Sequence, residues 1–300
     1  MTMHGSIRIS AADGYALGGT VFDGGRGPVV VVSGATGVHQ RYYARFAAWL
    51  ASEGATVITF DYRGIGESRP FRLRGFEARV RDWGEHDLEG VLRFASEAFP
   101  RRALRLVGHS VGGQLLGLAP SVARASGVMT VASQSGYWGH WPLPTKVAFA
   151  GLWYGLMPLT SSLVGYFPGK LGVGEDLPRG VAQEWARWCR SAGYFTDHGV
   201  SPDGFARLRA PVLAFSFTDD PYAPKPAVDW LHGLLSSASV ERAHLAPGDL
   251  GVRAVGHFGF FRDSFRDSLW TAARDFLLGA RPALAALRPV TEVCEFHGAV

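Results

Sequence analysis

The chain has 300 residues, of which 47% are apolar and 19% are charged, and its formal net charge is +4. This balance is typical of a globular protein with a sizeable core, and it excludes a disordered or fibrous chain. Arginine supplies nearly all of the positive charge, but no arginine tract with interleaved aromatic residues is present, so we expect no nucleic-acid partner.

The first half of the chain alternates between strand and helix signals. A β-hairpin is predicted around Asp13-Gly14-Tyr15, and the continuous β-branched run that follows it predicts a central parallel strand buried on both faces. This alternation predicts an α/β fold with a doubly wound, mostly parallel sheet and right-handed crossovers. The predicted strands are 7–10, 16–22, 28–34, 56–61 and 103–107, and the predicted helices are 42–53 and about 84–98.

The segment Leu106–Gly113 reads as a short apolar strand that runs into Gly-x-Ser-x-Gly and then into a predicted helix at 114–119. This is the sequence form of a nucleophile elbow, in which the serine occupies a strained strand-to-helix turn. Gly108 and Gly112 suit such a turn because it brings their backbones too close to other atoms for a Cβ. Ser110 is therefore predicted to be a nucleophile, and the plain alternative is an inert serine in a turn.

The alternation stops after a predicted strand at 127–133. Residues from 136 to about 205 give no strand signal and are rich in aromatic residues and proline, whereas strand and helix signals resume after them. The simplest organisation is a core domain formed by residues 1–135 and 207–300, with a helical cap insertion at 136–206. The later predicted strands are 211–217 and 240–245, the later helices are about 226–236 and 264–278, and the tail from 281 is left unassigned.

A serine hydroxyl needs a base within hydrogen-bond reach, and the base must in turn be oriented by an acid. On this topology the acid and then the base follow the serine along the chain. Asp219 and Asp220 leave the strand at 211–217, and His257 lies in the loop before the last helix. We assign His257 as the base and Asp220 as the acid, with Asp219 as its rival. The plain alternative for His257 is that it caps the last helix.

Two backbone N–H groups should stabilise the oxyanion. Val111 follows the nucleophile directly, and Ala35 lies in the loop after the first central strand, so these two residues are the predicted donors. The remaining histidines fit no metal-ligand spacing, and we expect neither a metal nor another cofactor. Asp61, with Gly64 and Gly66, is interpreted as a structural turn.

The insertion carries five of the nine tryptophans, and 23 uncharged residues lie between Lys146 and Lys170. We predict a cap with an apolar inner face over Ser110, in which Trp138, Trp153 and Tyr154 bind substrate. The alternative is that these aromatic residues only hold the cap on the sheet. The uncharged stretch is long enough for a transmembrane helix, but Pro158 and its place inside a sheet domain argue against one. No stable membrane insertion is expected, and shallow membrane contact is the alternative.

A basic run follows the Asp61 turn and comprises Arg69, Arg72, Arg74, Arg79 and Arg81. Solvated surface is the default interpretation, and docking of an acidic carrier or a phosphate-bearing thioester is the alternative. Cys189 and Cys294 are interpreted as free thiols in a reducing compartment. The start of the chain lacks the pattern of a secretory signal, so a cytoplasmic protein is expected. A homodimer is left open.

Over residues 7–280 the chain resembles the α/β-hydrolase superfamily. The resemblance rests on Ser33-Gly34-Ala35, Asp61-Tyr62-Arg63-Gly64-Ile65-Gly66-Glu67-Ser68, Gly108-His109-Ser110-Val111-Gly112-Gly113, Asp220 and His257. The chain is also similar to a bacterial group of predicted α/β-hydrolases in Ser135-Gly136-Tyr137-Trp138 and in the segments around Glu184 and His257. This similarity does not indicate a substrate. Ser33 departs from the histidine usual before Gly34.

These observations predict a serine hydrolase that cleaves an ester or thioester of an apolar acyl group through an acyl-enzyme on Ser110. Two alternatives share the same residues. One is acyl transfer to an alcohol or amine, and the other is a binding protein that retains the triad without turnover.

Overall fold

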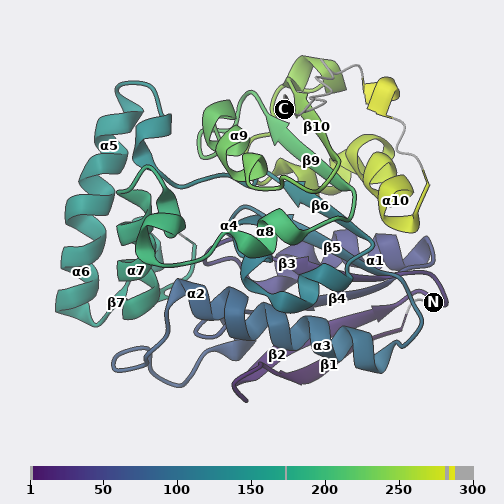
Figure 1. The fold of residues 1–300 in the computed structure, drawn as a ribbon, viewed down its shortest axis with the longest axis horizontal. Coiled ribbons are helices and arrows are strands. Elements are labelled where there is room, and N and C mark those ends of the chain that lie inside the picture. The colour runs from purple at the N-terminus through teal and green to yellow at the C-terminus, as the bar shows by residue number, and fades with distance from the viewer. Residues whose placement is uncertain (1–2, 173, 281–283, 288–300) are drawn as a thin grey trace.

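The computed structural model describes residues 3–172, 174–280 and 284–287. Its main sheet has eight strands in the order β1-β2-β4-β3-β5-β6-β9-β10, which confirms the doubly wound α/β fold (Figure 1). β2 pairs antiparallel with both β1 and β4, and every other pair in this sheet is parallel. The strands are β1 (Met3–Ser10), β2 (Ala16–Asp23), β3 (Val29–Ser33), β4 (Thr56–Phe60), β5 (Leu104–His109), β6 (Gly127–Val131), β9 (Val212–Phe217) and β10 (Val240–Leu245).

Helices cover both faces of this sheet, which is why its central strands are apolar throughout. In β3, Val29 and Val31 belong to one buried cluster together with α3, whereas Val30 and Val32 belong to a second cluster together with α1 and α10. The helices outside the insertion are α1 (Ala44–Ser52), α2 (Val80–Asp82), α3 (Glu89–Ala98), α4 (Val111–Gln114), α9 (Lys225–Gly233) and α10 (Thr271–Leu278).

The helix after the elbow is shorter than the sequence predicts. Instead of a helix over 114–119, α4 ends at Gln114 and two 3-10 turns follow it. Glycine is a poor helix former, and Gly112, Gly113 and Gly117 lie within or beside this helix, with Pro120 close behind. Gly117 also packs against the ring of Phe205, which leaves no room for a side chain there. The last predicted helix, in contrast, starts with 3-10 and π-helical turns before α10.

Of the described residues in the insertion, none joins the eight-stranded sheet. The insertion forms α5 (Thr145–Gly151), α6 (Met157–Val164), α7 (Arg179–Cys189) and α8 (Asp203–Arg207), and α5 to α7 lie together at the left of Figure 1. It also contains a strand pair that the sequence did not predict, β7 (Tyr166–Phe167) with β8 (Leu177–Pro178). Two residues per strand are too few to give a period that a sequence could reveal.

Residues Thr145–Val164 form one helical stretch that is long and apolar enough to cross a membrane, with a mean hydropathy of 1.4. Only 17% of its most apolar window is buried. Leu159 and Leu163 are among its exposed side chains, whereas Trp153 and Met157 face the protein interior. The tail from 281, which the sequence left unassigned, lies outside the described residues except for one 3-10 turn at Leu284–Leu287.

Candidate active site

The predicted nucleophile lies in the turn between β5 and α4. Ser110 has φ of 52° and ψ of −117°, a conformation that costs about 1–3 kcal/mol for a residue with a Cβ. Glycine neighbours make the turn possible: a Cβ at Gly108 would lie 2.8 Å from Gly113 Cα, and a Cβ at Gly112 would collide with the carbonyl oxygen of Ser33. This turn follows the carboxyl end of β5, a central strand. Ser110 therefore lies at the carboxyl ends of the parallel strands, where the later loops converge.

Ser110 is brought together with His257 and Asp220, from two loops that lie far along the chain. Ser110 Oγ is 2.9 Å from His257 Nε2, and His257 Nδ1 is 2.8 Å from Asp220 Oδ2. A carboxylate only accepts hydrogen bonds, so Nδ1 carries the proton and Nε2 accepts from the serine hydroxyl. Each of these residues is at most 7% exposed. The arrangement can deprotonate the hydroxyl as it attacks a carbonyl carbon.

The two neighbouring aspartates make different contacts. The second oxygen of Asp220, Oδ1, accepts the N–H groups of Tyr222 at 2.8 Å and Ala223 at 3.1 Å, which fixes the carboxylate against the histidine. Asp219 instead accepts the N–H groups of Val255 and Gly256, at 2.8 and 3.1 Å. Asp219 therefore holds the loop that carries His257, and it forms no hydrogen bond with the imidazole.

A directed chain of hydrogen bonds links the elbow to both neighbouring loops. His109 Nε2 lies 2.9 Å from the carbonyl oxygen of His257, and Nδ1 lies 2.9 Å from Tyr43 Oη. Burial, with a smaller effect of His257, lowers the pKa of His109 to about 3, so its imidazole is neutral near pH 7. A carbonyl only accepts, so Nε2 of His109 donates to His257 and Nδ1 accepts from the Tyr43 hydroxyl.

The same chain changes the prediction for the oxyanion hole. Tyr43 Oη accepts the N–H of Ala35 at 2.8 Å, so this N–H, predicted from the sequence as an oxyanion donor, already has a partner. The sequence did not reveal this because Tyr43 reaches the loop from the start of the following helix. Across the described residues, no group accepts from Thr36 N–H or from Val111 N–H, and the hydroxyl of Thr36 is buried without a partner. Thr36 replaces Ala35 as the candidate second donor.

Ser33, which departs from the usual histidine, is fully buried beneath this loop. Its hydroxyl lies 2.6 Å from Tyr62 Oη and 3.3 Å from the carbonyl oxygen of Gly112. The serine thus joins the loop after β3 to the elbow, and its hydroxyl forms no hydrogen bond with Ser110 or His257. Asp61 similarly accepts the N–H groups of Gln40 and Glu67, in agreement with its interpretation as part of a structural turn.

A cavity of about 510 Å³ opens beside Ser110 and His257. Its walls come from the loop after β3, the loops that carry the triad and the insertion. Of the three predicted substrate-binding residues, only Trp153 lines it: Tyr154 is 55% exposed, and Trp138 packs against Tyr154 instead. The other side chains around it are Ala35, Thr36, Val38, Gln134, Trp141, Thr145, Ala148, Phe149, Leu152, Leu171, Trp185, Tyr222 and Phe258.

Sequence analysis missed the functional candidates Thr36, Gln134 and Tyr43. A signal exists for Gln134, because it directly follows the predicted strand at 127–133, and ligands in α/β proteins bind at the carboxyl ends of strands. His109 is part of the elbow sequence, and its two ring nitrogens join the loops on either side. No sequence pattern pairs it with Tyr43.

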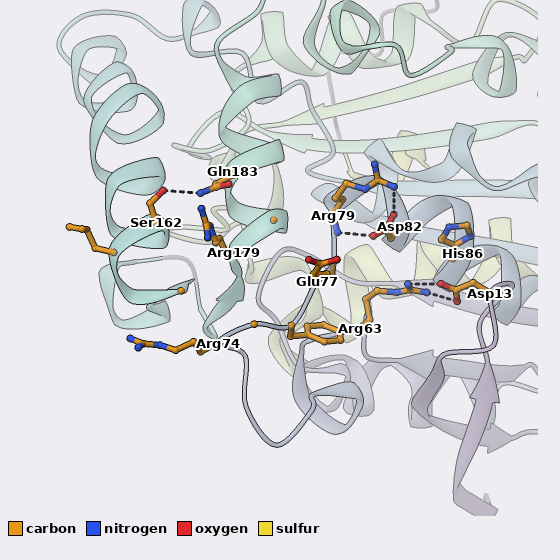
Figure 2. A pocket seen from close by; sticks show the side chains of 16 residues that line it. Asp13, Arg63, Arg74, Glu77, Arg79, Asp82, His86, Ser162, Arg179 and Gln183 are labelled. Carbon is orange, nitrogen blue, oxygen red and sulfur yellow. Dashed lines mark hydrogen bonds and ion pairs between the residues drawn. The ribbon is translucent and has the colours of Figure 1, made fainter.

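A larger and more polar cavity of about 880 Å³ lies between α2 and the insertion (Figure 2). Figure 2 shows Arg63 paired with Asp13 and Arg79 paired with Asp82, and Arg74 lying below the end of α6. Four arginines of the basic run bind partners: Asp176, the carbonyl oxygen of Val164, Asp82 and Glu184. Three of these partners belong to the insertion, so the run joins the insertion to the core, and none of the lining residues forms a nucleophile–base pair.

A family model described as Hydrolase_4, serine aminopeptidase, S33, matches residues 25–161. The matched segment holds the loop after β3, the Asp61 turn and Ser110, but it ends before Asp220 and His257. No curated protein sequence matches the chain.

Many solved structures share this fold at low identity. A putative hydrolase from Agrobacterium vitis is 18% identical, with a TM-score of 0.60, and the match covers 92% of this chain and 99% of that one. An esterase from Exiguobacterium antarcticum is 18% identical, with a TM-score of 0.58 and coverage of 90% and 98%. Est1E from Butyrivibrio proteoclasticus, solved with ferulic acid bound, is 13% identical, with a TM-score of 0.58 and coverage of 91% and 98%.

Proposed function

We propose that this chain, which has an α/β-hydrolase fold, is a serine hydrolase that cleaves an ester or thioester of a largely apolar acyl group through an acyl-enzyme on Ser110. The observation that supports this proposal most directly is the unbroken hydrogen-bond sequence Ser110–His257–Asp220 at the edge of a mostly apolar cavity.

In the first half-reaction, Ser110 Oγ attacks the substrate carbonyl carbon while its proton moves to His257 Nε2. The carbonyl oxygen becomes an oxyanion, which the free N–H of Val111 and the N–H or hydroxyl of Thr36 stabilise. Asp220 keeps the imidazole in the tautomer that can accept this proton, and it stabilises the imidazolium that forms. His257 then donates the proton to the departing alkoxide or thiolate, and the acyl group stays on Ser110.

In the second half-reaction, His257 takes a proton from water as the water oxygen attacks the acyl carbon. The second tetrahedral intermediate collapses, the proton returns to Ser110 Oγ, and the carboxylic acid is released. The aromatic walls of the cavity exclude bulk water from the acyl group and favour an apolar chain or ring.

The test is a series of p-nitrophenyl esters and matching acyl thioesters of increasing chain length. We expect wild-type protein to hydrolyse part of the series, with an optimum set by the cavity, and we expect Ser110→Ala to lose this turnover. Equal activity of wild type and Ser110→Ala, or no turnover across the series by folded wild-type protein, would refute the proposal.

A further inference from the structure

Buried polar atoms without a partner gather at the active-site cavity. In the described part of the chain, ten buried side-chain nitrogen or oxygen atoms have no hydrogen-bond partner, and three of them belong to residues that line this one cavity. These residues are Thr36, Gln134 and Trp153. Thr36 borders the candidate oxyanion hole, whereas Gln134 and Trp153 belong to the walls. Leaving a buried polar group without a hydrogen-bond partner is unfavourable, so these three residues at the substrate cavity favour a substrate that supplies the missing partners.

Gln134 presents an acceptor. Its Nε2 donates to the carbonyl oxygen of Tyr222 at 3.0 Å. Because that carbonyl only accepts, the amide group can have only one orientation, and Oε1 is the atom left over. Oε1 has no partner, and the residue is 6% exposed. The group that satisfies Gln134 must therefore be a hydrogen-bond donor.

Trp153 presents a donor. Three tryptophans line the cavity, and two of them are satisfied within the protein, since Trp141 Nε1 donates to the carbonyl oxygen of Pro221 and Trp185 Nε1 donates to Tyr194 Oη. Trp153 is only 4% exposed and its Nε1 has no partner. Its ring is held between Phe149, stacked at 6.1 Å, and Trp185, edge-on at 5.0 Å. The group that satisfies Trp153 must be an acceptor.

We propose that Gln134 and Trp153 are specificity-determining residues, and that the acyl group of the substrate carries a hydroxyl or amide group on an otherwise apolar body. Such a group supplies both a donor and an acceptor, which a plain hydrocarbon chain does not. This proposal rests on the proposed function, because it describes the acyl group that Ser110 attacks. It narrows the apolar acyl class to acids with one polar group away from the carboxyl end.

The experiment compares p-nitrophenyl esters in matched pairs, so that the leaving group and the size of the acyl group are constant. One set pairs ω-hydroxy esters with the methyl-terminated esters of the same length, and another pairs the para-hydroxyphenylpropanoyl ester with its para-methyl counterpart. The readout is the ratio of kcat/KM within each pair. We expect the hydroxyl member to be favoured by about 10-fold or more in at least one pair, as expected for a net hydrogen bond.

Trp153→Phe removes the indole N–H and keeps an aromatic ring, and Gln134→Met removes the acceptor at similar length. In both variants, the ratio of kcat/KM between the hydroxyl ester and its methyl counterpart should fall close to one. Trp138→Phe is the matched control, because Trp138 Nε1 also lacks a partner but the residue does not line the cavity, so the ratio should persist.

Two failures can be told apart. If wild-type protein hydrolyses the methyl-terminated esters as well as or better than every hydroxyl partner, the specificity proposal is wrong and the serine hydrolase proposal stands. If it hydrolyses no ester of either kind, the proposed function itself fails. A ratio that survives both Trp153→Phe and Gln134→Met would also overturn the assignment of these residues.

Discussion

Asp219 and Asp220 are adjacent, and only Asp220 forms a hydrogen bond with the imidazole of His257. The sequence could narrow the acid to this pair, but it could not choose between them, because the choice depends on which carboxylate the loop after β9 turns toward His257. In the structure Asp220 contacts His257, while Asp219 holds Val255 and Gly256. Each aspartate therefore predicts a different mutant phenotype.

Asp220→Asn should lower kcat by about 10³–10⁴-fold, because an amide can donate to His257 Nδ1 and so favour the tautomer that cannot accept the serine proton. Asp219→Asn keeps one acceptor oxygen for the loop and should cost less than about 10-fold. Steady-state hydrolysis of one ester by both variants makes the comparison. Equal losses, or a greater loss for Asp219→Asn, would contradict the assignment.

Tyr43→Phe should destabilise the fold. The substitution leaves the buried N–H of Ala35 and Nδ1 of His109 without partners, which we expect to cost about 2 kcal/mol in the free energy of unfolding. Urea denaturation measures this change. Tyr42→Phe is the control, because the Tyr42 hydroxyl makes one exposed bond to the carbonyl oxygen of Phe258. If Tyr43→Phe were no less stable than Tyr42→Phe, the hydrogen-bond chain through Tyr43 would not contribute to the stability of the fold.

At the level of elements, the strand–turn–helix unit of β5 and α4 could be predicted well from the sequence, because its glycines and serine follow a fixed spacing. The sheet was equally predictable, since continuous apolar runs are hard to place anywhere but in central parallel strands. The structure of the insertion could not be predicted in the same way. Its β7–β8 pair is too short to show a period, and only packing decides which of its aromatic residues lie in the core, at the surface or at the cavity. Trp153 and Tyr154 are neighbours in sequence, yet one lines the cavity and the other is exposed.

Gly112→Ala tests the close approach of α4 to the loop after β3. A methyl group there would collide with the carbonyl oxygen of Ser33, so either the elbow or the loop must move. A shift of about 1 Å at a reacting group can lower turnover by about 100-fold, and we expect a loss of that order. Gly248→Ala, where a methyl group would meet open space, is the matched control in the ester assay. Activity of Gly112→Ala equal to this control would argue against the described packing.

At the level of the whole molecule, two buried neutral histidines couple stability to pH. Burial lowers the pKa of His109 to about 3 and that of His232 to about 4. Both lie below the value of about 6.5 for an unfolded chain, so acid protonates the unfolded state first and stability is lost as the pH falls from about 6.5 toward these values. Each histidine should cost about 2 kcal/mol between pH 7.5 and pH 5.

His232→Gln isolates one of these contributions. His232 donates from Nδ1 to the carbonyl oxygen of Val228 and accepts at Nε2 from Thr130, and a glutamine amide offers one donor and one acceptor without titrating. The difference between the unfolding free energies at the two pH values should shrink by about 2 kcal/mol in the variant. An unchanged difference would mean that His232 does not carry this acid sensitivity.

The central claim is that Ser110 is an activated nucleophile, and covalent labelling with a fluorophosphonate tests it most directly. The account predicts a stoichiometric adduct on the peptide that contains Ser110, located by mass spectrometry, with labelling lost in Ser110→Ala and strongly slowed in His257→Ala. Labelling of Ser110→Ala at the wild-type rate, or folded wild-type protein that remains unlabelled, would contradict it.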